Sequence, residues 1–213
     1  MRWTMIIDLD KCSACQTCTV ACKVENGLGP AINRVVIVEK ESGVYPDVKR
    51  IYIPKRCMNC KDPQCIRVCP SGATAQRSDG IVYIDKDKCI GCRYCVIACP
   101  YNARSYQRYE LSYHREPSQW EKKRYVEHHV GTVDKCDFCL HRIDEGMKLG
   151  LKPGVDLDAS PACVFSCIGN ALYFGDLDDP ESEVSRLIVS REGFQLLPEM
   201  KTDPSIYYLP RRY

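Results

Sequence analysis

Short apolar runs alternate with cysteine-rich polar segments along most of this chain. The runs at residues 5–7 and 81–84 are rich in β-branched residues, and a cluster of cysteines follows each within a few positions. Short apolar runs bounded by turn residues predict strands. Residues 17–22, which end in a cysteine, predict a short helix. The repeated order of strand, cysteine loop and helix favours an α+β fold.

Three further segments have clear patterns. Residues 34–39 and 49–54 lie on either side of Ser42 and Gly43 and predict an inserted hairpin. The segment after Leu140 predicts a short helix followed by a Pro-Gly turn. Prolines recur in the tail from Leu197, which favours an extended C-terminal arm over residues 191–213. A free arm would be disordered, so an ordered one is expected to lie across a partner.

All sixteen cysteines fall into four groups of four. Groups one and three are spaced C-x2-C-x2-C-x3-C, which holds three thiolates around one cluster and sends the fourth to a neighbouring cluster. A proline follows the last cysteine of groups two and three, as in bacterial ferredoxins. The sequence therefore predicts sixteen ligands and four 4Fe-4S clusters. In order, the groups are Cys12, Cys15, Cys18 and Cys22; Cys57, Cys60, Cys65 and Cys69; Cys89, Cys92, Cys95 and Cys99; Cys136, Cys139, Cys163 and Cys167.

Disulfides and zinc are the competing interpretations. A disulfide scaffold is usually secreted, and no apolar leader opens this chain. The pairs Cys57–Cys60 and Cys136–Cys139 could each form half of a tetrahedral zinc site. A zinc site closes with four ligands and gains nothing from the triplets of groups one and three, so their spacing favours iron–sulfur clusters.

The chain also repeats itself. Residues 7–12 match residues 84–89, and the match continues through the triplets to Cys22 and Cys99. Residues 63–69 resemble residues 161–167, although group four carries a long insertion between its second and third cysteines. The sequence therefore predicts an internal duplication into two ferredoxin-like units, each with one triplet group and one looser group.

Composition limits the remaining possibilities. The 213 residues include four Phe and two Trp, few for a core held by apolar burial alone, so we predict that the cluster-free protein does not fold. The net charge of +2 gives no bulk electrostatic reason to bind nucleic acid. No apolar run reaches the roughly eighteen residues of a membrane span. No export signal is recognised, so the chain is expected either to stay in the cytoplasm or to be exported folded with a partner.

The stretches without cysteines suggest weaker hypotheses. Residues 104–129, which include Arg104, are basic and aromatic and could form a solvated connection or a docking surface. His128 and His129 could ligate a metal, but sixteen cysteines already account for four clusters. His141 could tune a nearby cluster, although a surface side chain is the favoured interpretation. Apolar residues between the ligands are expected to shield the clusters from water: Val20, Ala21, Val68, Val96, Ile97, Ala98, Val164 and Phe165. No dinucleotide motif, P-loop or catalytic triad stands out, so the chain is not expected to catalyse a reaction itself.

The order and spacing of all four groups resemble a known family over residues 3–175. The most specific segments are residues 8–18 (DLDKCSACQTC), 57–70 (CMNCKDPQCIRVCP), 89–101 (CIGCRYCVIACPY) and 134–139 (DKCDFC). The chain resembles the iron–sulfur electron-transfer subunits of the dimethyl-sulfoxide reductase superfamily of molybdopterin oxidoreductases. Members include subunits of dimethyl-sulfoxide, polysulfide, thiosulfate and arsenate reductases and of phenylacetyl-CoA:acceptor oxidoreductase.

The resemblance implies nested pairing of the groups, first with fourth and second with third, whereas the residues alone also allow sequential pairing. One unit, residues 1–50 with 125–190, would bind two clusters: Cys12, Cys15, Cys18 with Cys167, and Cys136, Cys139, Cys163 with Cys22. The other, residues 51–124, would bind Cys57, Cys60, Cys65 with Cys99, and Cys89, Cys92, Cys95 with Cys69. Some nitrate-reductase relatives replace a third-group cysteine by tryptophan; here all four are present, which predicts four-iron clusters throughout.

The resemblance also implies partners. The Cys12 cluster would face a molybdenum or tungsten pterin subunit, and the Cys89 cluster would face a membrane anchor that exchanges electrons with quinone or haem. The chain would then be membrane-associated through its partners, on the cytoplasmic face or in the periplasm. The alternative is a free soluble polyferredoxin that serves several enzymes, which would purify alone rather than with a large catalytic chain.

Overall fold

A three-stranded sheet lies at the centre of the computed structural model, which describes residues 1–109, 112–125 and 130–212. β1 (Trp3–Asp8) is its middle strand, with β8 (Leu172–Asp176) antiparallel on one side and β9 (Ile206–Leu209) parallel on the other. Side chains alternate along a strand. Met5 and Ile7 therefore enter the main core, whereas Ile6 packs with Val184 beneath α7 (Glu183–Ser190). Burial on both faces explains the uninterrupted apolar run in β1.

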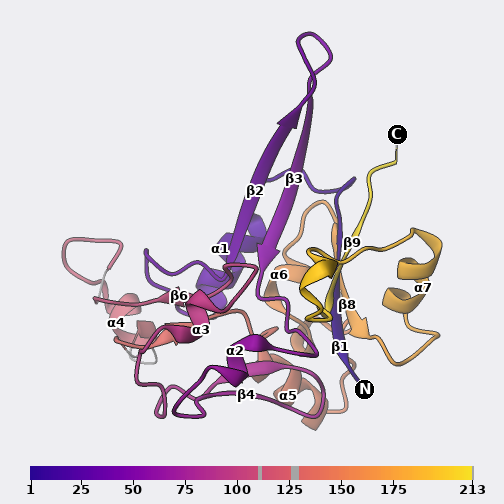
Figure 1. The fold of residues 1–213 in the computed structure, drawn as a ribbon. Coiled ribbons are helices and arrows are strands. Elements are labelled where there is room, and N and C mark those ends of the chain that lie inside the picture. The colour runs from indigo at the N-terminus through magenta and orange to yellow at the C-terminus, as the bar shows by residue number, and fades with distance from the viewer. Residues whose placement is uncertain (110–111, 126–129, 213) are drawn as a thin grey trace.

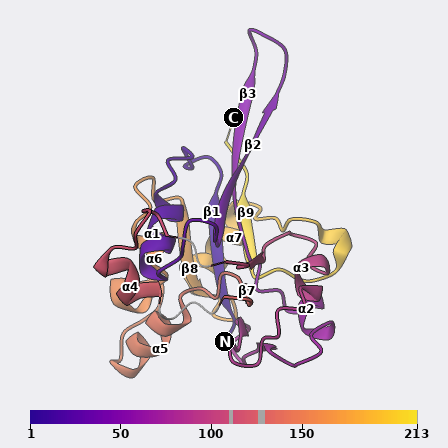
Figure 2. The same cartoon turned by 90° about the vertical axis from the view of Figure 1, so that its left-hand side faces the viewer.

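The predicted hairpin is confirmed and is longer than expected. β2 (Val35–Ser42) and β3 (Lys49–Arg56) pair antiparallel along their whole length. Val35 and Arg56 at its base are buried, whereas Val44 and Tyr45 near its tip are exposed. Both ribbon views show the hairpin projecting from the body (Figures 1 and 2).

The other elements are short and surround the cysteine loops. Two small ladders join β4 (Thr74–Gln76) to β5 (Val82–Ile84) and β6 (Ser105–Tyr106) to β7 (Val133–Asp134). Figure 2 shows two groups of helices on opposite sides of the central sheet. One comprises α1 (Thr17–Glu25), α4 (Gln119–Tyr125), α5 (Leu140–Lys148) and α6 (Ala162–Phe165), and the other α2 (Gln64–Arg67) and α3 (Tyr94–Ile97). The 3₁₀ turns η1 (Leu157–Ala159) and η2 (Pro198–Met200) complete the element order.

Strands and helices occur where the pattern predicted them. The run at residues 81–84 contains β5, the helix beginning at residue 17 is α1, and the helix after residue 139 is α5. Gly154 of the predicted Pro-Gly turn has a positive φ of 91°. The structure is thus mixed α and β, with the cysteines in loops and in the short helices next to them.

The C-terminal segment is a correction to the sequence-based expectation. Instead of lying across a partner as an arm, it folds back and adds β9 to the central sheet, where Ile206, Tyr208 and Leu209 are fully buried. Arg2 fixes the approach to this strand by donating to Ser205 and Asp203. β9 is a short apolar run that lies between Pro204 and Pro210, and these prolines hid it as a strand. Among the described residues, no helix has the length and apolarity needed to cross a bilayer.

Candidate iron–sulfur centres

Four cysteines from both ends of the sequence surround the first cavity, here called site 1. Its lining includes Cys12, Cys15, Cys18 and Cys167. Cys12 and Cys15 lie on the loop from β1 into α1, Cys18 lies in the first turn of α1, and Cys167 follows α6. Ala14 and Gln16, between them, have positive φ values of 58° and 64°, which turn the loop tightly enough to aim three sulfurs inward. The backbone N–H of Ala171 donates to the Cys167 sulfur at 3.3 Å.

A second cavity, site 4, repeats this geometry on the other side of the molecule. Its lining includes Cys69, Cys89, Cys92 and Cys95. Gly91 and Arg93 occupy the positions equivalent to Ala14 and Gln16, with φ of 67° and 64°. A Cβ on Gly91 would lie 2.0 Å from the Gly131 carbonyl oxygen, so this turn requires glycine. The Thr74 N–H donates to the Cys69 sulfur at 3.4 Å, as Ala171 does to Cys167.

A third cavity, site 3, is lined by the four cysteines Cys57, Cys60, Cys65 and Cys99, together with Arg104 and Thr202. The looser group two supplies three of them from the loop after β3 and from α2, and Cys99 follows α3. Burial raises the pKa of Cys60 to about 12. Without a metal this thiol is protonated at neutral pH, so cluster binding must displace its proton.

The remaining cysteines form site 2, the most buried set: Cys22, Cys136, Cys139 and Cys163 are all buried. Cys22 lies near the end of α1, which packs against α6, the helix of Cys163. Asn26 Nδ2 lies 3.6 Å from the Cys22 sulfur and 3.9 Å from the Cys139 sulfur, so groups one and four meet there. Burial raises the pKa of Cys136 to about 12 and that of Cys22 well above its ordinary value.

The structure therefore brings together three cysteines of one group with one cysteine of its nested partner at each of the four sites. None of the three lined cavities combines groups one and two, or groups three and four, as sequential pairing would require. The helices explain why each triplet group supplies two sites. The fourth cysteine of each triplet group lies one helical turn beyond the third, and it points to the next site.

The donor set fits an iron–sulfur cluster better than a single ion. The residues that the structure describes contain no group of three or more His, Cys, Asp or Glu side chains that could hold one metal ion. The cysteines instead line hollows, and soft thiolate sulfur is the ligand that iron–sulfur clusters use. Zinc, which draws its four ligands onto one point, fits this spacing poorly.

Two buried arginines near the cysteine sulfurs also fit an iron–sulfur cluster. Arg56 is 1% exposed and Arg104 is 5% exposed, and each has guanidinium nitrogens that find no acceptor among the described residues. Sequence reasoning missed Arg56 and placed Arg104 in a surface segment; the structure corrects both. No sequence signal marks them, because only the assembled fold shows that they are buried beside cysteines.

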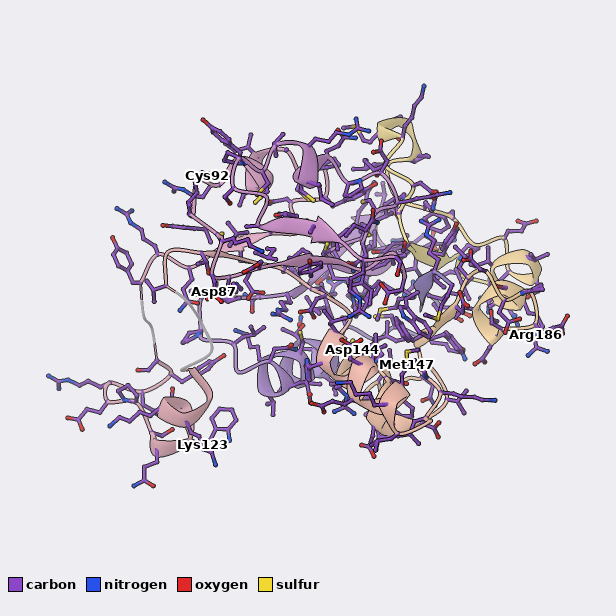
Figure 3. The ribbon with its side chains drawn as sticks, turned by 90° about the horizontal axis from the view of Figure 1, so that it is seen from below. Asp87, Cys92, Lys123, Asp144, Met147 and Arg186 are labelled. Carbon is purple, nitrogen blue, oxygen red and sulfur yellow. The ribbon has the colours of Figure 1, made fainter. Side chains whose placement is uncertain are left out.

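The apolar residues expected to shield the clusters are not all buried. Val20 beside site 1 is 57% exposed and Ile97 beside site 4 is 83% exposed. Ile168, Ile90 and Tyr94 in the same two regions are exposed as well, as are the ligand candidates Cys15 and Cys92. Cys92 lies at the margin of the molecule in Figure 3. Sites 1 and 4 thus open to solvent, whereas site 2 does not.

Some residues of the basic and aromatic segment, residues 104–129, make defined contacts. Tyr113 donates from its hydroxyl to the Leu28 carbonyl at 3.2 Å, and the Glu121 carboxylate accepts from the Tyr113 backbone. Tyr109 and Trp120 are exposed. The candidate metal ligands His128 and His129 lie outside the described residues. His141 is a half-exposed side chain that contacts Glu25 at 2.8 Å, as expected of a surface histidine.

Known proteins with similar sequences are subunits of reductase complexes. A family described as a 4Fe-4S dicluster domain matches residues 48–115. A selenate reductase subunit from Mesobacillus selenatarsenatis is 43% identical over 98% of this chain and 72% of its own length. A putative dimethyl sulfoxide reductase iron–sulfur subunit from Halobacterium salinarum is 41% identical over 98% of this chain and 79% of its own.

A third relative extends the comparison to the whole chain. The iron–sulfur cluster-binding subunit of menaquinone reductase from Nitratidesulfovibrio vulgaris is 37% identical over 100% of this chain and 90% of its own length. These three relatives are 37–43% identical to this chain over at least 98% of its length, and the similarity agrees with the arrangement of its cysteines. The chain belongs to the family of 4Fe-4S electron-transfer subunits of molybdopterin oxidoreductases of the dimethyl-sulfoxide reductase superfamily.

Proposed function

We propose that this chain relays single electrons through four 4Fe-4S clusters, one at each site, between a molybdenum or tungsten pterin subunit and a membrane quinone or haem partner. The observation that carries the proposal is that sixteen cysteines form four sets of four, and three of the sets line cavities. Each cluster would supply one-electron redox chemistry, and the protein would hold it, insulate it and set its potential.

The order of the sites follows from shared elements. Sites 1 and 2 share α1, where Cys18 and Cys22 are one turn apart, about 6 Å along the axis. Sites 3 and 4 are linked in the same way through Cys95 and Cys99, in and just after α3. We therefore propose two double-cluster units, residues 1–50 with 125–190 and residues 51–124, related by duplication. The matching left-handed loop positions of sites 1 and 4 support that relationship.

A buried polar contact supports a path between the two units. Lys135, next to Cys136 of site 2, donates to the Cys136 carbonyl at 2.9 Å and lies 3.5 Å from Asn59 Oδ1. Asn59 in turn contacts the carbonyl of Cys57, a residue of site 3. Sites 2 and 3 are thus neighbours, which gives the linear order 1, 2, 3, 4.

The exposed ends fit partner docking. Site 1 and site 4 are the outermost sites in this order, and both are flanked by exposed apolar side chains. By resemblance, site 1 would face the pterin subunit and site 4 the membrane anchor. The chain would be membrane-associated through these partners. A free polyferredoxin is not favoured, because relatives that match 98–100% of this chain are named as subunits.

Iron and sulfide analysis of anaerobically purified protein tests the proposal. About sixteen irons per chain are expected, and about twelve after replacement of Cys57 by Ser, which removes one ligand of site 3. Thr202→Ser, in the same cavity but with its hydroxyl kept, should retain the full iron content. About four zinc ions, or far fewer irons than sixteen in the unaltered protein, would refute the proposal. As a separate measurement, mass spectrometry of the intact complex would identify the large partner.

A further inference from the structure

Two buried arginines lie beside the cysteine sites with nitrogens that no described residue satisfies. For Arg56 the unpartnered atoms are Nε and Nη2, and for Arg104 the atom is Nη2. An isolated buried charge costs several kcal/mol unless an opposite charge or acceptor compensates it. The unpartnered nitrogens therefore point to an acceptor at each position that the described residues do not supply.

Arg56 lies between sites 1 and 2. Its Nη1 donates to the Cys163 sulfur of site 2 at 3.0 Å and lies 3.2 Å from the Met5 sulfur. Cys167 of site 1 follows Cys163 by four residues, one helical turn, so the contacted sulfur lies where the two sites adjoin. One guanidinium thus lies beside both sites.

Arg104 has the equivalent position between sites 3 and 4. It lines the cavity of site 3. Its Nη1 donates at 3.3 Å to Thr74 Oγ1, and Thr74 lines the cavity of site 4 and donates its backbone N–H to the Cys69 sulfur. The side chain thus reaches from site 3 to the wall of site 4.

Neither arginine has a carboxylate partner among the residues that the structure describes, although other buried arginines do. Arg34, for comparison, is ion-paired with Asp134 at 2.6 Å and with Asp137 at 3.1 Å. A cluster held by four thiolates carries net negative charge and presents sulfur acceptors, so it supplies what Arg56 and Arg104 lack.

We propose that Arg56 and Arg104 are positioning residues that set cluster potentials in pairs, Arg56 raising those of sites 1 and 2 and Arg104 those of sites 3 and 4. The inference rests on the proposed function. In the step concerned, one electron from a redox partner reduces one cluster and no proton moves, because the guanidinium keeps its charge throughout. A fixed nearby cation stabilises the added negative charge, and a low local dielectric strengthens that effect.

Potentiometric titration monitored by EPR, on the anaerobically purified holoprotein, tests the proposal. Arg56→Met is expected to lower the midpoint potentials of two clusters, and Arg104→Met those of the other two. Each shift should be at least about 59 mV, which is a tenfold change in the equilibrium constant for one-electron reduction. Arg56→Lys and Arg104→Lys, which keep the charge, should shift them less. Arg77→Met is the matched control, because that arginine pairs with Asp79 and Asp144.

The outcomes separate this inference from the proposed function. Unchanged potentials in a methionine variant with wild-type iron content would overturn the inference, as would the same two clusters shifting in both variants. A wild-type protein without about sixteen irons or without cluster EPR signals would instead overturn the proposed function.

A measurement on the unaltered sequence covers variants that fail to fold. Wild-type protein labelled with ¹⁵N-arginine is expected to show ¹⁵N hyperfine coupling to the reduced clusters by HYSCORE spectroscopy. A reduced, fully loaded protein without any such coupling would contradict contact between the guanidinium groups and the clusters.

Discussion

Replacing Arg34 by Met should destabilise the proposed unit formed by residues 1–50 with 125–190. Arg34 is largely buried, and its Nε lies 2.6 Å from Asp134 Oδ1. Its Nη1 lies 3.1 Å from Asp137 and donates to Asn26 at 2.8 Å. Asp134 also accepts from Lys86 at 2.9 Å, so one network joins the base of the hairpin, β7 and the loop after β5.

The size of the effect follows from charge separation and burial. Charge centres about 4 Å apart interact by about 4 kcal/mol at an effective dielectric constant near 20. Loss of one partner of a buried pair costs about 3–5 kcal/mol when the other charge is left uncompensated. Asp134 keeps its pair with Lys86, so the lower end of that range, about 3 kcal/mol, applies. At about 2–4 °C per kcal/mol for a chain of this length, the thermal midpoint of Arg34→Met should fall by roughly 6–12 °C.

The electrostatic state of Asp134 gives a second expectation. Although burial favours the neutral acid, Arg34 and Lys86 hold the pKa of Asp134 well below its usual range. Without Arg34 that pKa should rise. The stability contributed by this carboxylate is present above the unfolded pKa of about 4 and is lost as pH falls through the folded value.

The assay is a double-mutant cycle on the holoprotein. Thermal midpoints of Arg34→Met, Asp134→Asn and the double variant are measured at one scan rate, because cluster loss makes unfolding irreversible. The double variant should lose clearly less than the sum of the single losses. Arg50→Met is the control, since its pairs with Glu39 and Glu41 on the hairpin are about half exposed and worth little. A strictly additive cycle, or a fall no larger than that of Arg50→Met, would refute the reasoning.

Three shorter predictions concern other parts of the molecule. Gly146→Ala places a Cβ 2.3 Å from the Ala159 Cβ and should lower stability by about 1–3 kcal/mol in a thermal melt, whereas Met147→Ala, at an exposed neighbour, should have little effect. Asp203→Asn removes a carboxylate whose pKa is lowered by Arg2, although burial opposes that effect. The resulting loss in thermal midpoint should be constant from about pH 6 to 8 and should shrink below about pH 4. A loss that grows on acidification would contradict this prediction. Removal of the clusters by chelation under reducing conditions should abolish the cooperative melt seen by circular dichroism; a retained melt would show that the polypeptide folds alone.

The local elements could be predicted from the sequence because their signals are local. Runs rich in β-branched residues on both sides of Ser42 and Gly43 specify a hairpin, and the triplet cysteines specify a turn into a helix. Which groups share a site is a different question. Cys22 and Cys163 are far apart in sequence and meet because α1 packs against α6, which no spacing rule encodes. Only the resemblance to a family supplied the nested pairing beforehand.

The tail shows why composition alone misleads. Prolines on both sides of residues 206–209 suggested an arm, yet a strand needs only a few residues and a free sheet edge. β1 offered that edge, and β9 pairs with it in parallel through residues that the whole intervening chain separates. The pairing partner was therefore invisible to any window of sequence.

The buried arginines also change the reason to expect that the cluster-free chain does not fold. The sequence argument rested on a shortage of Phe and Trp, but the core is large and includes the aromatic contacts of Phe174 with Trp3 and Phe138. The stronger reason is electrostatic: Arg56 and Arg104 are buried without a carboxylate among the described residues. A folded apo-protein would bear both uncompensated charges, so cluster insertion and burial of these side chains should occur together. On this reasoning, neutral replacement of both arginines should make the cluster-free chain easier to fold even as it lowers the cluster potentials.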